Sequence, residues 1–363
     1  MKILMTADAV GGVWTYAMEL CRALATCEVQ VVLATMGPPP TSAQCAEART
    51  LANVRLVSAP WKLEWMADPW QDVERAGEWL LACADREHVE LIHVNGYAHA
   101  ALPWSRPVLV VAHSCVCSWW RAVHAEPAPP RWDRYRQAVA AGLAAADLVV
   151  APTQALLDML AAEHGRLERA TVIHNARAVP VATERLRDDA IFTCGRVWDE
   201  AKNLCLLDRA ARALPWPAYV AGDSISPDGH AREMLNLVCL GRLPATDVRA
   251  WLRRASIFVH PALYEPFGLA VLEAAQHGCA LVLSDVPTLR ELWAGAAEFV
   301  SPHDPVALRA RLVHLIEAPE QRKALGVAAR ARAQAFEVDA MAAAYRRSYA
   351  HLRSHSYERR ATA

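Results

Sequence analysis

The chain of 363 residues lacks several patterns that mark common classes of protein. Its ten cysteines include no C-x-x-C pair, which argues against zinc or redox chemistry, and their apolar neighbours predict reduced core residues. No G-x-G-x-x-G sequence is present, which argues against a dinucleotide oxidoreductase. The formal net charge of -1 gives no overall basic surface, so we expect no nucleic-acid partner.

Metal-binding and membrane-spanning patterns are also missing. No Asp-x-Asp pair is present, so we expect no obligatory divalent ion. Cys115 and Cys117 would share a face in a strand, but a separation of one residue is poor for a metal site. No apolar run reaches the roughly 18 residues of a membrane span. The first expected strand follows Met1 so closely that no secretory signal fits, and we expect a cytoplasmic protein.

What the chain does contain is an alternation of short apolar runs and helical patterns, which occurs twice. Its length and its 54% hydrophobic content are natural for two domains. Each alternation predicts parallel strands with crossover helices in a three-layer α/β domain. The expected strands span 2–6, 29–34, 91–94, 108–112 and 148–151, and then 191–194, 218–221, 257–260, 280–283 and 297–300. The expected helices span 15–25, 204–213, 245–254, 305–316 and 338–351.

The boundary between the two halves is expected at a hinge over 175–189, because this stretch carries a proline and mixed charges. We therefore predict an N-terminal domain of residues 1–177, a C-terminal domain of 178–340 and a terminal segment of 341–363. The tail is basic, so peripheral contact with an anionic membrane is one reading, and a solvated, partly disordered end is the favoured one. Its basic residues are Arg346, Arg347, Arg353, Arg359 and Arg360.

The segment 264–278 is the most informative part of the chain. Pro266 suits the first position of a helix, and Gly278 suits its C-terminal stop. Free amides near the helix start, together with the positive end of the helix dipole, would form a site for a phosphate or another anion. These amides belong to Phe267, Gly268 and Leu269.

Two carboxylates, Glu265 and Glu273, stand eight positions apart around this helix start. Glu273 is the only charge in a run of Leu, Ala and Val, so it needs a partner. At about 1.5 Å per residue it lies roughly 7 Å along the axis, about the span from a diphosphate to the hydroxyls of its ribose. A nucleoside diphosphate would satisfy both ends. In the alternative reading, Glu265 complements the helix dipole and Glu273 pairs with an arginine elsewhere in the chain.

A pair of cations follows the expected strand 191–194. Arg196 and Lys202 lie near the C-terminal end of this strand, where open α/β sheets bind ligands. Such cations can neutralise a diphosphate leaving group without a metal, and arginine adds bidentate geometry. Ordinary surface charge at a strand end is the alternative reading.

The first half of the chain offers less specific signals. Gly11 and Gly12 follow the first strand and form either an anion-binding turn or an ordinary tight turn. His113 ends an expected strand and is either a hydrogen-bonded core residue or a ligand contact. Tryptophans are abundant here, and as a group they suggest an apolar or carbohydrate acceptor, although a single tryptophan is ordinarily a core residue. Trp119 and Trp120 are nearest to His113 in sequence.

The spacing of Glu265 and Glu273, and the pair Arg196 and Lys202, resemble the E-x7-E and G-R…K-N motifs of glycosyltransferase family four, whose members are retaining enzymes of the GT-B fold. The resemblance spans nearly the whole chain and is concentrated in its second half. It implies two Rossmann-like, doubly wound α/β domains that face a central cleft, with the terminal helix crossing back to the first domain. The first domain would bind the acceptor, and the second would bind the nucleotide sugar.

The resemblance also implies a role for each motif residue. Arg196 and Lys202 would clamp the pyrophosphate, Glu273 would hold the ribose hydroxyls, and Glu265 would lie beside the donor sugar. The amides at 267–269 would hold the diphosphate. The other implied contacts are Gly241 and Leu243 for the base, Gly11 and Gly12 for the diphosphate, His113 for the sugar, and Thr15 and Tyr16 for the acceptor. From their place in the sequence beside His113, we add Trp119 and Trp120 as acceptor contacts.

The sequence departs from the family pattern in two places. His174, Asn175 and Ala176 replace the usual N-G pair, and the proline that normally follows Gly222 and Asp223 is absent. The first departure leaves open whether the hinge, or a donor contact close to it, follows the family pattern. The segment 240–243 does not distinguish uracil from guanine or adenine.

We expect a metal-independent, retaining hexosyltransferase that moves a sugar from a nucleoside diphosphate to a hydroxyl acceptor. A UDP-sugar is the favoured donor and a GDP-sugar the next. The acceptor would be a carbohydrate, a lipid-linked molecule or a small-molecule hydroxyl. Two alternatives remain: a nucleotide-sugar 2-epimerase of the same fold, which would convert its donor without an acceptor, and a non-catalytic sugar-nucleotide-binding regulatory module.

Overall fold

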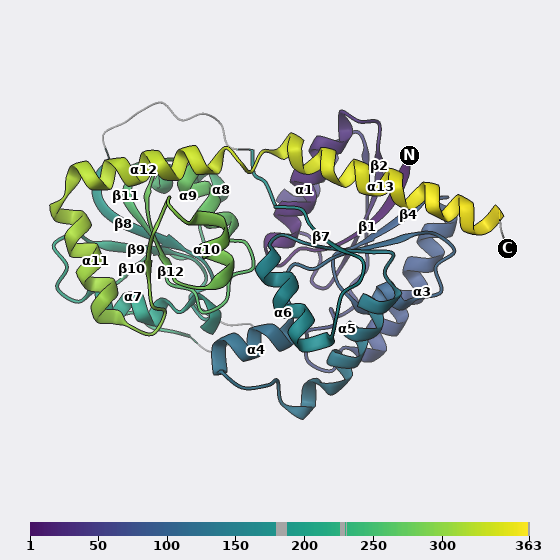
Figure 1. The fold of residues 1–363 in the computed structure, drawn as a ribbon, viewed down its shortest axis with the longest axis horizontal. Helices are drawn as coiled ribbons and strands as arrows, with labels where there is room; N and C mark the ends of the chain where they lie inside the picture. The colour runs from purple at the N-terminus through teal and green to yellow at the C-terminus, as the bar shows by residue number, and fades with distance from the viewer. Residues whose placement is uncertain (179–186, 226–228, 230, 362–363) are drawn as a thin grey trace. The chain divides into compact units, whose positions relative to one another are not determined.

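The computed structural model describes residues 1–178, 187–225, 229 and 231–361, with side chains described up to residue 354. The chain forms two compact units (Figure 1). The predicted hinge at 175–189 falls partly outside the described residues, as do the side chains of Arg359 and Arg360 in the predicted basic tail. The first unit comprises Met1–Arg121, Glu126–Ala176 and Glu337–Ala363, and the second comprises Ala122–Ala125 and Arg177–Phe336.

The first unit contains, among its described residues, a seven-stranded parallel sheet in the order β3-β2-β1-β4-β5-β6-β7. Strands such as β5, with the sequence VLVV, are buried along their whole length, as expected for parallel strands covered on both faces. The strand order reverses between β1 and β4. The strands are β1 (Lys2–Asp8), β2 (Gln30–Met36), β3 (Val54–Ser58), β4 (Leu91–Val94), β5 (Val108–Val111), β6 (Leu148–Ala151) and β7 (Ala170–Val172).

Helices connect these strands and cover the sheet. The prediction that the first helix begins near Thr15 is wrong: α1 begins at Gly12, with Gly11 as its N-cap. The helices of the first unit are α1 (Gly12–Ala25), α2 (Ser42–Arg49), α3 (Trp70–Arg86), η1 (Ala98–Ala101), α4 (Val116–His124), η2 (Pro130–Trp132), α5 (Asp133–Ala145), α6 (Gln154–His164) and α13 (Val338–Ala361).

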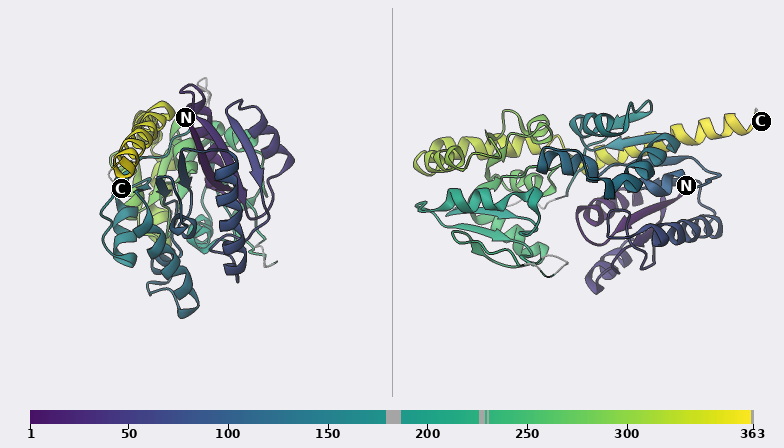
Figure 2. Two further views of the ribbon diagram at one scale, coloured as in Figure 1. Left: turned by 90° about the vertical axis from the view of Figure 1, so that its right-hand side faces the viewer. Right: turned by 90° about the horizontal axis from the view of Figure 1, so that it is seen from below.

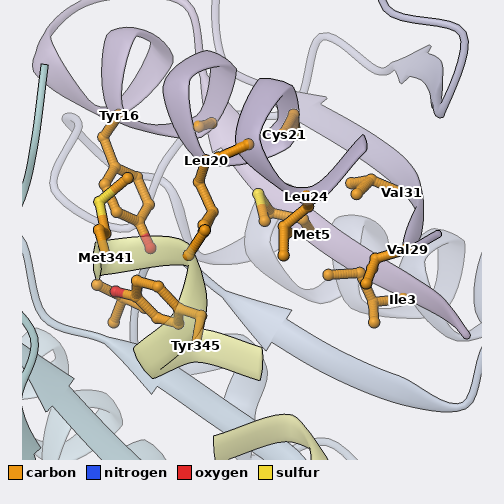
Figure 3. Packing of buried hydrophobic residues seen from close by; sticks show 14 of the residues in the cluster. Ile3, Met5, Tyr16, Leu20, Cys21, Leu24, Val29, Val31, Met341 and Tyr345 are labelled. Atoms are coloured by element: carbon orange, nitrogen blue, oxygen red, sulfur yellow. The ribbon is translucent and has the colours of Figure 1, made fainter. Parts of the chain in front are cut away.

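One face of the first sheet packs against α1 and α13. Alternate residues of a strand share a face, so Ile3 and Met5 of β1 point together toward Leu20 and Leu24 of α1 (Figure 3). Tyr345 of α13 is fully buried in the same cluster. Two further views show α13 lying along the first unit (Figure 2). A segment that follows the second unit in the sequence therefore completes the core of the first.

The second unit repeats this architecture. Within its described part, a six-stranded parallel sheet has the order β10-β9-β8-β11-β12-β13, which reverses between β8 and β11. The strands are β8 (Asp188–Cys194), β9 (Ala218–Ala221), β10 (Val238–Cys239), β11 (Ala255–His260), β12 (Ala280–Ser284) and β13 (Glu298–Val300). The helices are η3 (Glu200–Lys202), α7 (Leu204–Ala211), α8 (Ala245–Arg254), α9 (Leu269–Gln276), α10 (Pro287–Trp293), α11 (Pro305–Glu317) and α12 (Pro319–Ala333).

Two hydrophobic cores cover the two faces of the second sheet. Phe258 of β11 packs with Leu272 of α9 on one face, and its neighbour Val259 packs with Leu207 of α7 and Leu312 of α11 on the other. Because both faces are buried, the sheet is held in place from both sides, and the polar loops at its ends are where a ligand site can form.

The predicted α/β class with two Rossmann-like parallel sheets is confirmed. The strands expected at 91–94, 148–151 and 218–221 match β4, β6 and β9 residue for residue. In the described part of the chain, no helix is both long enough and apolar enough to cross a membrane.

Candidate active site

A group of interacting polar residues in the second unit lies beyond the C-terminal ends of β8 and β11. These two strands are neighbours, and the strand order reverses between them. In open α/β sheets the ligand binds at this reversal, because the loops after the two strands leave on opposite sides of the sheet. The loop after β8 supplies Arg196 and Lys202, and the loop after β11 supplies Glu265.

Glu265 is held by two neighbours. Its Oε2 atom lies 2.6 Å from Nζ of Lys202 and 2.9 Å from Nε2 of His260. Burial alone would raise the pKa of Glu265, but the charge of Lys202 and the hydrogen bond to His260 outweigh burial and leave this pKa well below its usual range. The side chains of Lys202 and Glu265 are only 20% and 12% exposed, so the pair is fixed and still reachable at its edge. His260 was not anticipated from the sequence, although it ends a predicted strand.

The backbone around Glu265 is also fixed. Thr288 donates a hydrogen bond from Oγ1 to the Glu265 carbonyl at 2.6 Å. Asn203, in the left-handed conformation, donates from Nδ2 to the carbonyls of Pro261 and Pro302. The loops that carry Lys202 and Glu265 are thereby tied to each other by both side-chain and main-chain groups.

Arg196 is paired with Asp199 rather than left as loose surface charge. Its Nε and Nη2 atoms lie 3.1 and 2.5 Å from Asp199 Oδ2, and the guanidinium also lies over the ring of Trp198. Asp199 in turn accepts a hydrogen bond from the Ala201 amide at 3.0 Å, which starts η3. Arg196 is 43% exposed, so it keeps a face open to a ligand.

The ends of β8 and β9 come unusually close. A Cβ atom at Gly222 would lie 1.8 Å from the Gly195 carbonyl oxygen, so only glycine fits there. The Gly222 amide donates to the Gly241 carbonyl at 2.9 Å. Gly241 is exposed and Leu243 is half-buried against the core, so the predicted base-contacting segment lies at this same end of the sheet. The missing proline after Asp223 does not disturb this arrangement.

The start of α9 differs from the prediction. Pro266 does not occupy the first helical position, because α9 begins at Leu269 and Gly268 is its N-cap. Gly268 has φ of +84°, a left-handed conformation that a residue with a side chain adopts only under strain. The described residues supply no acceptor for the amides of Gly268 and Leu269, which leaves both amides available to an anion. Phe267 places its ring in the core, so only its main chain can serve the site.

The end of this helix agrees with the prediction. The last helical residue is Gln276, and Gly278 follows the C-cap.

Glu273 is the fifth residue of α9 and forms an ion pair with Arg177. The Glu273 Oε1 atom lies 2.9 Å from Nε of Arg177, and both side chains are 14% exposed. Gln276, one turn further along α9, donates from Nε2 to the Arg177 carbonyl at 2.7 Å. The pairing of Glu273 with an arginine was foreseen as an alternative, but Arg177 was not identified. Burial and the nearby charge of Glu273 raise the pKa of Cys194 to about 12.

Among the predicted site residues of the first unit, His113 belongs to a network of hydrogen-bonded side chains. His113 donates from Nε2 to Asn95 Oδ1 at 2.8 Å, and Asn95 Oδ1 also lies 3.3 Å from Nε2 of the fully buried His93. Asn95 is anchored to Thr6 of β1 by two hydrogen bonds, of 2.9 and 2.6 Å. The Tyr349 hydroxyl of α13 lies 2.7 Å from His93 Nδ1. A chain of uncharged polar groups thus runs from His113 back into the core.

Burial keeps both histidines of this hydrogen-bonded network, His113 and His93, neutral. It lowers the pKa of His113 to about 3, and burial together with the neighbouring His113 lowers the pKa of His93 to about 3. Because the Nε2 proton is donated to Asn95, Nδ1 of the neutral His113 has no proton and can only accept a hydrogen bond near neutral pH.

Tyr16 does not suit the acceptor contact predicted for it. Its side chain is 1% exposed, its hydroxyl lies 3.3 Å from His93 Nε2, and its ring packs edge-on against His113 with 4.5 Å between centroids. Tyr16 instead packs against the His113 ring and helps to hold it in place. Thr15 is half-buried, and the Gly11 and Gly12 backbone stays accessible at the start of α1.

Trp119 and Trp120 lie on α4, which follows the His113 loop. Both are half-buried, and their rings are 5.8 Å apart. Arg131 covers Trp120 with its guanidinium 4.8 Å from the ring centre. An aromatic surface of this kind can stack on a sugar or an apolar acceptor.

Two family models match adjacent parts of the chain. The model described as "Glycosyltransferase Family 4" matches residues 10–177, and the model described as "Glycosyl transferases group 1" matches residues 188–318. A D-inositol 3-phosphate glycosyltransferase of Frankia alni is 28% identical over 96% of both chains. A glycogen synthase of Mycobacterium tuberculosis is 38% identical over 95 residues, which make up 26% of this chain and 23% of the relative.

Solved structures share the fold over nearly the full length. Sucrose-phosphate synthase from Thermosynechococcus elongatus has a TM-score of 0.79 at 18% identity, with 97% of this chain and 99% of the other covered. The Anabaena protein HepE, solved in complex with UDP and glucose, has a TM-score of 0.72 at 16% identity, with 96% and 99% covered. Since the two family models and the fold agree with the motifs at the second sheet, the chain belongs to the GT-B glycosyltransferases of family four.

Proposed function

We propose that this glycosyltransferase is a retaining hexosyltransferase that uses a nucleoside diphosphate sugar and transfers its sugar to a hydroxyl acceptor. Residues 178–340 would bind the donor and residues 1–177 the acceptor. The observation that carries the proposal is the pair Lys202 and Glu265 at the strand-order reversal of the second sheet, because it holds a cation where a diphosphate would lie.

The chemistry rests on charge that develops on the leaving diphosphate. Lys202 and Arg196 each keep part of their surface exposed while an acidic partner fixes their position. The free amides of Gly268 and Leu269 add oriented dipoles at the start of α9. Preorganised cations and amides of this kind stabilise a departing anion without rearranging during the reaction, and they take the part that a divalent ion plays elsewhere.

Glu265 and Glu273 would have separate tasks. Glu265 positions Lys202 and lies beside the donor sugar, and its depressed pKa keeps it ionised throughout the physiological range. Glu273 would accept hydrogen bonds from the ribose hydroxyls, with Arg177 orienting its carboxylate. In this scheme the departing phosphate takes the acceptor's proton, so neither acid acts as a general base.

The first unit would contribute contacts without charge. His113 is neutral near pH 7 and is held by Asn95, so it can hydrogen-bond a sugar hydroxyl. Gly11 and Gly12 would approach the diphosphate with their main chain, and Trp119 and Trp120 would stack against the acceptor. The acceptor would be a carbohydrate, a lipid-linked molecule or a small-molecule hydroxyl.

A UDP-sugar is the favoured donor. HepE, which shares the fold, was solved with UDP and with UDP-glucose, and this supports the same class of donor here. The segment around Gly241 and Leu243 would contact the base through main-chain groups. A GDP-sugar is the second choice.

The proposal is tested with the full chain in two steps. Thermal shift with UDP, GDP, ADP and their glucose conjugates identifies the donor class, and we expect the largest rise in melting temperature with the uridine compounds. The best donor is then incubated with sugars, lipid-linked sugars and phenolic acceptors after chelator treatment, with and without added Mg²⁺. We expect transfer that does not depend on Mg²⁺ and a product that NMR shows to keep the anomeric configuration of the donor.

Each other outcome contradicts a specific part of the proposal. An inverted product rejects retention, tighter binding of guanosine compounds rejects the donor choice, and strict dependence on Mg²⁺ rejects the role of the protein cations. Conversion of the donor to an epimer without an acceptor would identify an epimerase. Donor binding with neither transfer nor slow hydrolysis would identify a regulatory module.

A further inference from the structure

The first unit contains a second cluster of reactive side chains that the transfer chemistry does not use. Cys115, Cys117 and His164 place their ligand atoms within 4.8 Å of one another. Sγ of Cys115 lies 3.3 Å from Nε2 of His164, and both cysteines are fully or almost fully buried. The separation of the two cysteines by one residue predicted a poor metal site. The third member of the cluster stands 49 positions after Cys115 and is not visible from the local sequence.

The fold holds the three side chains from separate elements. Cys115 lies in the loop after β5, Cys117 is the second residue of α4, and His164 is the last residue of α6. An ion pair between Arg121 of α4 and Glu163 of α6 joins the same two helices one turn further on. The approach of α4 to α6 therefore does not depend on the cluster alone.

The main chain around the two cysteines is also restrained. Tyr97 donates its hydroxyl hydrogen to the Ser114 carbonyl at 2.8 Å, and the Val116 amide donates to the Tyr135 hydroxyl at 3.2 Å. These bonds fix the residue before Cys115 and the residue between the two cysteines. Preorganised donors lose little freedom when an ion binds, which is the condition for a specific metal site.

The donor set is chemically selective. Two sulfurs and one imidazole nitrogen are the ligands of zinc sites with an open fourth position, whereas magnesium and calcium take oxygen ligands. Zinc lies about 2.3 Å from sulfur and about 2.0–2.1 Å from nitrogen, so a tetrahedral site separates its donor atoms by roughly 3.5–3.8 Å. The Cys115 Sγ to His164 Nε2 distance is 3.3 Å and no separation among the three ligand atoms exceeds 4.8 Å, so small shifts of the side chains reach these values.

The other ring nitrogen of His164 fits the same interpretation. In the described structure, Nδ1 is buried and has no hydrogen-bond partner, so Cys115 supplies the only polar contact described for this imidazole. An imidazole whose described polar contact comes from the cluster is poorly explained as a surface histidine.

We propose that Cys115, Cys117 and His164 bind one zinc ion, with a water molecule or an exogenous ligand in the fourth position. The ion ties the loop that begins at His113 to the end of α6. Its role is to fix this loop and with it the orientation of His113, which lies two residues before Cys115. Zinc is not part of the transfer reaction in this proposal.

The test uses the full chain, freed of metal by a chelator under reducing conditions. It is titrated with zinc chloride and, separately, with cobalt chloride. We expect one ion per chain, a higher melting temperature with zinc, and with cobalt the intense visible bands of a tetrahedral site together with thiolate-to-cobalt charge-transfer absorption. Exposed Cys205 and Cys239 are replaced by serine in the parent protein, so that surface thiols do not contribute.

Two ligand variants and one matched control complete the test. Cys117→Ser and His164→Gln should each weaken zinc binding by at least about a hundredfold, because loss of an outer partner alone costs about 10- to 100-fold. Cys83→Ser removes a cysteine that is equally buried in the first unit but lies outside the cluster, and it should bind zinc like the parent. Circular dichroism of the metal-free variants shows which of them fold.

Three results would reject the zinc site. Absence of the cobalt bands in the folded parent overturns the proposal. Unchanged zinc affinity in a folded Cys117→Ser or His164→Gln variant also overturns it, and so does an equal loss of affinity in Cys83→Ser. Because His164 is only half-buried, its variant keeps the test decisive where Cys117→Ser fails to fold.

Discussion

The two sheets share one strand order and carry opposite chemistry at their C-terminal ends. Numbered within each unit, the strands run 3-2-1-4-5-6 in the second sheet and in the same order with one added strand in the first. The loops of the second sheet present ion pairs such as Lys202 with Glu265, whereas those of the first present the neutral His113 bound to Asn95. Strand order therefore determines where polar loops gather, and the residues of the loops determine the chemistry.

The difference in charge follows from how each site is buried. In the second unit Glu265 and Glu273 each have a cation beside them, and the charge of Lys202 keeps Glu265 ionised in spite of burial. In the first unit no cation or carboxylate contacts His93 among the described residues, so burial keeps this ring neutral. One site is suited to a charged diphosphate and the other to uncharged hydroxyl groups.

The largest expected effect comes from removing the cation of the second unit. Lys202→Ala should lower kcat for sugar transfer by about 10²- to 10³-fold, the usual cost of losing one preorganised group that stabilises developing charge. The pKa of Glu265 should rise, because burial then acts with only His260 opposing it. Steady-state kinetics with saturating donor measures the first effect.

The matched control is Arg254→Ala, which breaks an exposed ion pair with Asp188 in the same unit. This exposed pair contributes at most about 1 kcal/mol to stability, and its loss should leave kcat unchanged. If the two variants had the same kcat, Lys202 would not stabilise charge in the reaction. The contrast between a charged site in the second unit and an uncharged site in the first would then fail.

A smaller effect is expected on donor binding. Glu273→Gln should weaken UDP binding by about 10- to 100-fold, since hydrogen bonds to a charged group contribute about 1.5–3 kcal/mol. The specific readout is calorimetry with UDP and with its 2′,3′-dideoxy analogue. The parent protein should prefer UDP strongly, and the variant should bind the two almost equally.

Arg177→Gln provides the comparison for this prediction. It removes the group that orients Glu273 but leaves the carboxylate, so it should reduce the preference for UDP only in part. A Glu273→Gln variant that still discriminates between the two nucleotides would mean that Glu273 does not contact the ribose.

The last prediction concerns stability rather than activity, at the neutral site of the first unit. The pKa of His93 falls from 6.5 in the unfolded chain to about 3 in the fold. The unfolded chain therefore binds this proton first as the pH falls, and stability is lost from pH 6.5 down to about 3, by about 1.4 kcal/mol per pH unit. Glu64 acts in the opposite direction: burial raises its pKa from 4.5 to about 7, so its contribution to stability is lost as the pH rises through that interval.

The two effects are separated with His93→Gln. Hydrogen exchange of peptides from the first unit, followed between pH 4.5 and 6.5, should show that the parent loses more stability on acidification than the variant. Tyr349→Phe removes one hydrogen bond to His93 but keeps the ring, and it should preserve the pH dependence at a cost of about 1 kcal/mol. Parallel pH profiles for the parent and His93→Gln would contradict a neutral buried His93.

Much of the fold could be predicted from local patterns. Continuous apolar runs located β4, β6 and β9 to the residue, because parallel strands covered on both faces need such runs. Strand β3, with exposed Arg55, and the very short β7 and β10 were missed, since a run of two or three residues or one with a polar face carries no clear periodicity. Pro266 was misplaced because the left-handed Gly268 delays the start of α9.

The candidate site was predictable only as a set of residue types. The chemical needs of a buried acid indicated that Glu273 requires a partner, yet nothing local pointed to Arg177, which is 96 positions away. Tyr16 was assigned to the acceptor because it follows the glycine loop, and only the packing of α13 shows that its side chain is buried.

The sequence by itself determined the strands, the helices and the types of charged residue near the ends of the second sheet, because these depend on neighbours within a few positions. Only the tertiary structure decided the partners: Lys202 with Glu265, Tyr349 with His93 across 256 positions, and Cys115 with His164. The physical reason is that such partners are brought together by the order of the strands and the packing of the helices, and burial then determines which of them stay charged.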